Sequence, residues 1–239
     1  INAPSGAKEG NWGVFEVSDI SLGDSSDPTF WDPISPPVWQ NEATDGAEIT
    51  GIFYGISNLL PATCAAVGAS ICAGTGGLLD IYWDGTPDAQ LGPATPAQRT
   101  ADGSFTNFTD GTFLVRLAFD SGIAAGNANV GIVGSAAPTS PGQFVGIADS
   151  YMSVDYSQIG PWTSVLDRDY FTTAFGQRDV RLRTIYNGTV AAWNGGGDII
   201  GAQSSDPFRA FTVPEPTTLA LLAAALVGAG LGSRRRRKT

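Results

Sequence analysis

The feature that most constrains the fold is an alternation of apolar and polar side chains with the period of a β-strand. It is clearest over residues 112–119, where one face would carry Phe113, Val115, Leu117 and Phe119. No amphipathic helical pattern of convincing length appears before Thr217, and only residues 161–175 could hold a helix or two short turns. The body of the chain is therefore predicted to be built from strands.

Turn-forming residues divide the sequence into short apolar segments. The chain contains 31 Gly and 15 Pro, and clusters of Gly, Pro, Asp and Asn recur between the β-prone segments. Further strands are expected at residues 11–20, 49–56, 78–83, 129–133, 143–154, 180–186, 190–193 and 208–213. About nine or ten short strands with this spacing predict an all-β fold, a β-sandwich of jelly-roll or immunoglobulin-like outline.

The C-terminal end of the chain has a different character. Residues 217–232 are uncharged and rich in Leu and Ala, and a basic cluster follows them, comprising Arg234, Arg235, Arg236, Arg237 and Lys238. As a helix with a rise of about 1.5 Å per residue, this stretch would be roughly 24 Å long, slightly short of a bilayer core of about 30 Å. A transmembrane helix is predicted, and by the positive-inside rule the body is exported. A buried helix with a solvated tail is the competing interpretation.

A short motif precedes the apolar stretch, namely Val213-Pro214-Glu215-Pro216. The end of the chain thus has three elements in order: this motif, one short hydrophobic helix and an Arg cluster. This order resembles the PEP-CTERM sorting signal of bacterial exosortase substrates. The resemblance implies that an exosortase-like membrane enzyme cleaves near residues 214–216. The expected parts of the chain are an exported domain (1–213), the sorting motif (214–216), a transmembrane helix (217–232) and a basic cytoplasmic tail (233–239). A permanently anchored protein is the competing outcome.

The resemblance also implies a place at the cell surface or in the extracellular matrix. Families with this signal are associated with exopolysaccharide, biofilm and floc formation, and residues 11–18, 49–56 and 78–83 also look like segments of floc-associated members. The leading hypothesis is a non-catalytic exported protein that contributes to aggregation, with extracellular polysaccharide as a candidate partner. The alternatives are a carbohydrate-binding module and an extracellular hydrolase that uses two carboxylates.

Composition removes several other classes of function. The chain carries 23 acidic and 13 basic residues, a net charge of −10, and five of those basic residues lie in the tail, so nucleic acid is not an expected partner of the body. The chain contains no His, which excludes His-dependent nucleophiles and zinc sites with His ligands. Its two cysteines, Cys64 and Cys72, are most simply one local disulfide in an exported protein.

Three aspartates near the end of a predicted strand are candidate calcium ligands. Asp80, Asp84 and Asp88 lie on and beside the turn at residues 84–87 and offer oxygen atoms, although the spacing of an EF-hand is not met. Asp80 and Asp84 are also the best candidates for a pair of carboxylates of the glycosidase type. For each of them, an ordinary solvated acid at a strand end is the structural alternative.

The six tryptophans are candidates either for the core or for platforms on which sugar rings stack. Neighbouring Pro and Asp residues place Trp31, Trp39 and Trp162 in loops, where their rings could contact glycans. Trp12 and Trp83 lie within predicted strands and are expected in the core.

Overall fold

The computed structural model of this chain describes residues 11–21, 36–41, 46–58, 72–89, 106–140, 143–189, 201–204 and 208–210. Strands make up most of these residues. Their helical segments are short: η2 (Thr106–Phe108) has 3 residues and α2 (Thr163–Leu166) has 4. The prediction of an all-β fold is confirmed.

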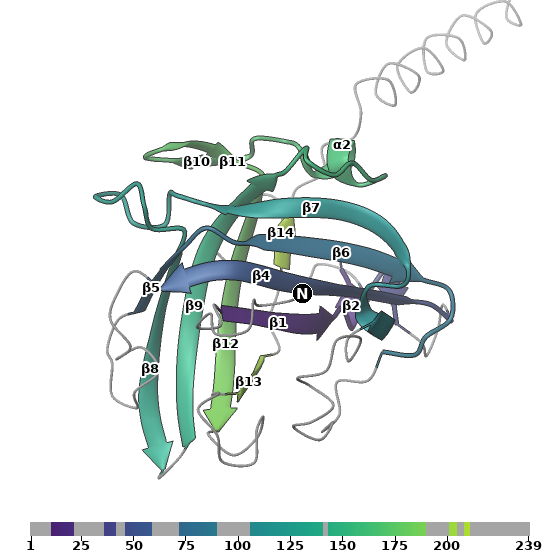
Figure 1. The fold of residues 1–239 in the computed structure, drawn as a ribbon, viewed down its shortest axis with the longest axis horizontal. Coiled ribbons are helices and arrows are strands. Elements are labelled where there is room, and N and C mark those ends of the chain that lie inside the picture. Colours follow the sequence, from purple (N-terminus) through teal and green to yellow (C-terminus); the bar gives the residue numbers. More distant parts are fainter. Residues whose placement is uncertain are drawn as a thin grey trace, which may run out of the picture.

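The strands form two layers that cross each other (Figure 1). The first layer consists of β1 (Asn11–Glu16), β4 (Glu48–Asn58), β6 (Leu78–Asp84) and β7 (Thr112–Asp120). The second consists of β8 (Ile132–Ser140), β9 (Gln143–Val154) and β12 (Val180–Thr189), with β13 (Gly201–Ser204) and β14 (Phe208–Ala210) along β12. The arrangement is sandwich-like, with the strands of one layer steeply inclined to those of the other.

The two layers are parts of one antiparallel sheet. β9 pairs with β8 and β12 over most of its length, and its last residues, Tyr151–Val154, pair with β7. At the other corner β5 (Cys72–Thr75) pairs with both β4 and β8. The pairings therefore close a ring, in the order β4, β6, β7, β9, β8, β5 and back to β4.

The hydrophobic core lies between the layers. Its buried members are Ile49, Ile56, Leu79, Ile81, Leu114, Val115, Leu117, Phe119, Met152, Leu166 and Val180. Most of them come from β4, β6 and β7, which the sequence predicts as strands, and Met152 and Val180 come from β9 and β12. The alternation on β6 and β7 therefore supplies a large part of the core.

One predicted face needs a correction. The pairing of β6 with β7 shifts between Ile81 and Tyr82, because Val115 lies opposite Ile81 whereas Phe113 lies opposite Tyr82. Leu114 is the extra residue of this β-bulge, and it is buried. Phe113 therefore leaves the face of Val115, and its ring packs edge-on against the Tyr82 ring at a centroid distance of 5.6 Å.

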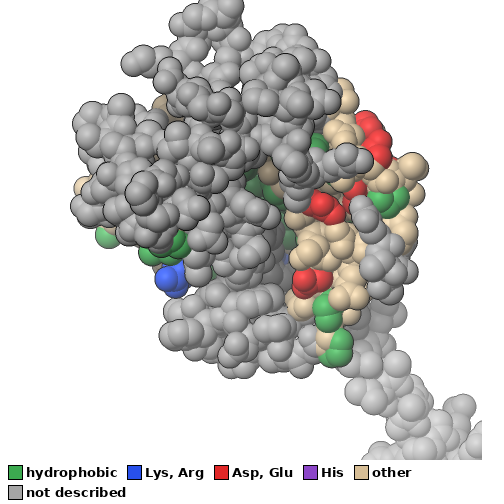
Figure 2. Space-filling model, turned by 90° about the horizontal axis from the view of Figure 1, so that it is seen from below, with side chains coloured by type: hydrophobic (Ala, Val, Ile, Leu, Met, Phe, Trp, Pro, Cys, Tyr) green, Lys and Arg blue, Asp and Glu red, His purple; other side chains and the backbone are tan. Residues whose placement is uncertain are grey.

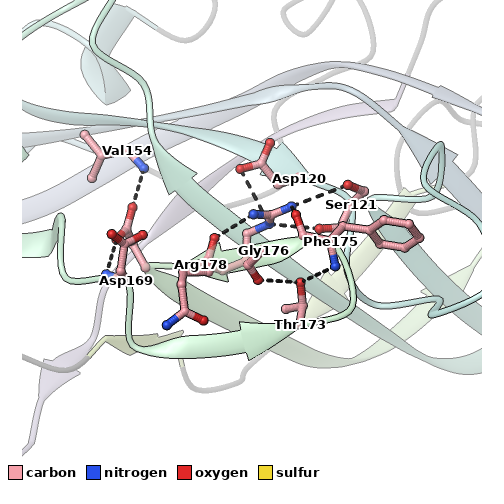
Figure 3. A network of polar contacts seen from close by, with 10 residues as sticks. Asp120, Ser121, Val154, Asp169, Thr173, Phe175, Gly176 and Arg178 are labelled. Carbon is pink, nitrogen blue, oxygen red and sulfur yellow. Dashed lines mark hydrogen bonds and ion pairs between the residues drawn. The ribbon is translucent and has the colours of Figure 1, made fainter.

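A connecting segment covers the ends of β9 and β12. It contains α2, β10 (Phe171–Thr173) and β11 (Gly176–Arg178), which lie together at the top of Figure 1. Arg178 ties the β10–β11 hairpin to the residue after β7, since its Nε donates to the Ser121 carbonyl at 2.8 Å (Figure 3). A separate pair, β2 (Asp19–Ile20) with β3 (Trp39–Gln40), completes the described strands.

Several predictions fall outside the described residues. Among the residues described, no helix is long and apolar enough to cross a membrane. The predicted transmembrane helix, residues 217–232, lies outside them, as do the sorting motif, the basic tail, Cys64 and Trp31. Because Cys64 is not described, the disulfide with Cys72 stays a prediction.

Candidate functional site

Three carboxylates meet where β4 begins and β6 ends. Glu48 is the first residue of β4 and pairs with Asp84, the last residue of β6. Asp88 comes four residues later, after a turn in which the Thr86 N–H donates to Asp84 Oδ1 at 2.7 Å. One oxygen from each of Glu48, Asp84 and Asp88 lies within 4.8 Å of the others. These three residues are called the acidic cluster below.

Glu48 holds the cluster to the sheet. Its side chain is fully buried, and its carboxylate accepts the backbone N–H groups of Asp88 at 3.1 Å and of Ala89 at 3.2 Å. Burial raises the pKa of Glu48 above its usual 4.5, and these two hydrogen bonds only partly counter that shift. The charged form of Glu48 is thus costly in this position.

Desolvation and, after it, nearby like charges affect Asp88 in the same cluster. The pKa of Asp88 is raised, first by desolvation and then by the nearby charges of Asp110 and Asp84. Asn107, in the short helix η2, donates its Nδ2–H to the Asp88 carbonyl at 2.8 Å and so holds the loop. Oxygen donors gathered in this way match the ligand preference of a hard cation such as calcium, although acidic groups are common without one.

The structure brings together two of the three predicted calcium ligands. Asp84 and Asp88 belong to the acidic cluster, whereas Asp80 lies four residues before Asp84 on β6, about 13 Å away along the strand. Glu48 takes the third place. The signal for it was the register, because Glu48 opens a strand that pairs with the end of β6.

Asp80 has a different role. Arg116 on β7 donates to it through Nε and Nη2, both at 2.7 Å, and the Tyr54 hydroxyl donates at 3.2 Å. Asp80 is 3% exposed. Its hydrogen bond raises the pKa of Arg116 further above the usual range, while burial and then the Asp80 charge raise the pKa of Tyr54 to about 12.

Of the tryptophans that the structure describes, Trp83 is placed differently from the prediction. Trp39 and Trp162, which the sequence left open between the core and a sugar platform, are partly buried and pack against the core, and Trp39 lies on β3 rather than in a loop. Trp83, expected in the core, is 43% exposed, because it lies at the end of β6, where its neighbour opposite on β7, Thr112, is also exposed. A Cβ added at Gly85 would be 3.3 Å from Trp83 Cη2, so the indole lies close to the backbone of that turn.

One face of the molecule carries mainly acidic charge on its described residues (Figure 2). This agrees with the net charge of −10. Such a surface favours cations and uncharged partners over polyanions.

Comparison with known proteins identifies the C-terminal part of the chain. No curated protein and no solved structure matches the chain. The family model described as the PEP-CTERM protein-sorting motif matches residues 212–237, which include the predicted motif at residues 213–216 and all four arginines of the basic cluster. The motif implies export, a membrane-anchored precursor and processing by an exosortase, a membrane enzyme. The chain therefore carries a PEP-CTERM sorting signal at its C-terminal end.

Proposed function

We propose that the protein is a non-catalytic component of the cell surface or extracellular matrix that contributes to aggregation, biofilm or floc structure. The observation that carries this proposal is the sorting motif at residues 212–237, attached to an all-β body. The motif begins two residues after β14 ends at Ala210, so cleavage near residues 214–216 would leave the described strands intact.

The arrangement of Asp80 and Asp84 argues against hydrolysis by this pair. A two-carboxylate hydrolase needs its carboxyl groups about 5–9.5 Å apart. Asp80 and Asp84 are about 13 Å apart along β6, and both oxygens of Asp80 are already hydrogen-bonded to Arg116. The pair that the sequence offered for hydrolysis is therefore poorly arranged for it.

The test compares native cells that make the intact chain with cells that make a Pro214→Ala, Glu215→Gln double variant. We expect the intact chain to appear in the matrix fraction with a C-terminus near residues 214–216, and the double variant to remain uncut in the membrane fraction with weaker cell aggregation. Gly126→Ala, at an open surface position in the body, is the matched control. If the intact chain were processed normally, yet cells with the gene deleted aggregated as well as cells that make the chain, the aggregation role would be contradicted.

Carbohydrate binding is the second candidate function. The observation that favours it is the exposure of Trp83, whose indole offers an apolar face beside polar turn residues. In this proposal Trp83, rather than Trp39 or Trp162, stacks on a sugar ring.

Its test is saturable binding of the body to neutral and acidic polysaccharides. Trp83→Ala should abolish binding to the neutral polymer, whereas Ile147→Ala, which truncates an exposed apolar side chain on β9, should leave it unchanged. Thermal unfolding checks that both variants fold. Equal binding by Trp83→Ala and the parent protein would contradict a site at Trp83.

A further inference from the structure

The C-terminal end of β14 fixes where the chain leaves the folded body. β14 runs antiparallel to β12, so that Phe208 pairs with Leu182 and Ala210 pairs with Val180, the first residue of β12. β9 also runs antiparallel to β12, and Met152 pairs with the same Val180. The chain therefore leaves β14 at the end of the sheet where β9 ends and β12 begins.

The same end of the sheet carries residues 155–169, here called the 155–169 segment. Asp179, next to Val180, binds it on both sides: its carboxylate accepts the backbone N–H groups of Val154 at 2.8 Å, Arg168 at 2.7 Å and Asp169 at 2.8 Å. Asp179 is 3% exposed. The 155–169 segment is thus held within a few residues of the point where the chain leaves β14.

The 155–169 segment exposes apolar side chains to an unusual degree. Ile159 is 73% exposed, Tyr156 57% and Val165 37%. Half of the six exposed large apolar side chains found in the described part of the chain therefore come from this one segment. The Tyr156 hydroxyl donates to Asp167, so its ring is held in place at the surface.

The tether to the membrane is short. Between Ala210 and the apolar stretch that begins at Thr217 there are only residues 211–216. A fully extended chain over this interval reaches at most about 25 Å. The sorting motif implies a membrane-anchored precursor, so the end of the sheet that carries β14 must stay close to the bilayer until cleavage.

We propose that in the anchored precursor the 155–169 segment lies against the lipid surface, with Ile159, Tyr156 and Val165 at the headgroup boundary. A Tyr with its hydroxyl in a polar contact and its ring exposed is typical of that boundary. Asp155, Asp167 and Asp169 flank these side chains, which favours zwitterionic over anionic lipid. The inference rests on the membrane anchor and is independent of the role in aggregation.

The test uses the full chain in vesicles of phosphatidylcholine brominated on its acyl chains. Ile159→Cys carries an environment-sensitive fluorophore, and Ile147→Cys is the matched control, since Ile147 is also exposed but lies on β9 about 23 Å before its end at Val154. The parent chain is labelled in the same way without reductant, as a control for labelling of the two native cysteines.

We expect the bromines to quench the fluorophore at position 159 at least several-fold more than at position 147, in protein that floats with the vesicles. Equal quenching at the two positions in floated protein would overturn this inference alone. Protein that does not float would contradict the membrane anchor itself, and with it both the sorting mechanism and this inference.

Discussion

The ring of Phe15 on β1 lies across Gly51 on β4. The two residues are paired in the sheet, and a Cβ added at Gly51 would be 2.3 Å from Phe15 Cζ and 2.4 Å from the Asp80 carbonyl oxygen on β6. The reciprocal pair is Gly13 with Phe53, where an added Cβ would be 2.5 Å from Phe53 Cζ. Each strand thus supplies one glycine that makes room for the aromatic ring of the other.

Gly51→Ala should therefore be strongly destabilising. The new methyl group meets a backbone oxygen as well as a ring, so rotation of Phe15 alone does not relieve the clash. We expect the free energy of unfolding, measured by urea denaturation, to fall by about 1–3 kcal/mol or more. Gly126→Ala, where nothing lies within 4 Å of the added Cβ, is the control and should change stability little. A similar, small effect of both substitutions would contradict the close packing of β1 on β4.

The ion pair between Asp80 and Arg116 predicts an asymmetric response to mutation. The Asp80 side chain is 4% exposed, so Arg116→Met leaves a buried carboxylate without its main partner. We expect a loss of about 3–5 kcal/mol in the free energy of unfolding. The double variant Asp80→Asn, Arg116→Met removes the uncompensated charge and should be more stable than Arg116→Met alone.

The control for this prediction is Arg183, whose Nε lies 3.8 Å from Asp149 and whose side chain is 51% exposed. Because exposed ion pairs contribute about 0–1 kcal/mol, Arg183→Met should be nearly neutral. If Arg116→Met were equally mild in urea denaturation, the Asp80–Arg116 pair would have no special role in stability.

The sequence predicted strands well where apolar side chains alternate. β6, β7 and β9 agree closely with the predicted ranges, and the alternating side chains of β6 and β7 supply much of the core. β8 was expected at residues 129–133 but spans Ile132–Ser140, and its later residues, Ala136-Ala-Pro-Thr-Ser140, have little strand propensity of their own. That part of β8 exists because it pairs with β9, and a pairing between strands leaves no local trace in the sequence.

The candidate site was predicted only in part for the same reason. Asp84 and Asp88 are close in sequence, so their proximity could be expected. Glu48 is distant in sequence, and only the register of β4 on β6 brings it to Asp84. Asp80 looked equivalent to Asp84, but its partner Arg116 lies on β7, whose register shifts at the bulge. The residue types indicated the chemistry of the site, while the long-range pairing of strands determined which residues form it.

Glu48 predicts how stability changes with pH. Its pKa is raised in the folded protein by burial, so folding favours the protonated form. The stabilisation is complete below the unfolded pKa of about 4.5 and is lost as the pH rises through the higher folded value. The free energy of unfolding of Glu48→Gln minus that of the parent chain should therefore be larger at pH 7 than at pH 4. Unfolding curves at both pH values check this, and an unchanged difference would contradict the raised pKa.

Calcium should offset the cost of the charged form of Glu48 in the acidic cluster. A divalent cation between Glu48, Asp84 and Asp88 would compensate the buried charge, so it should stabilise the parent chain at pH 7, by about 2.7 kcal/mol at a concentration 100 times the dissociation constant. Removal with a chelator should reverse the effect. Glu48→Gln should lose most of this response, whereas Asp149→Asn, which removes an acid far from the cluster on β9, should keep it. A calcium response that is the same in both variants would place the ion elsewhere.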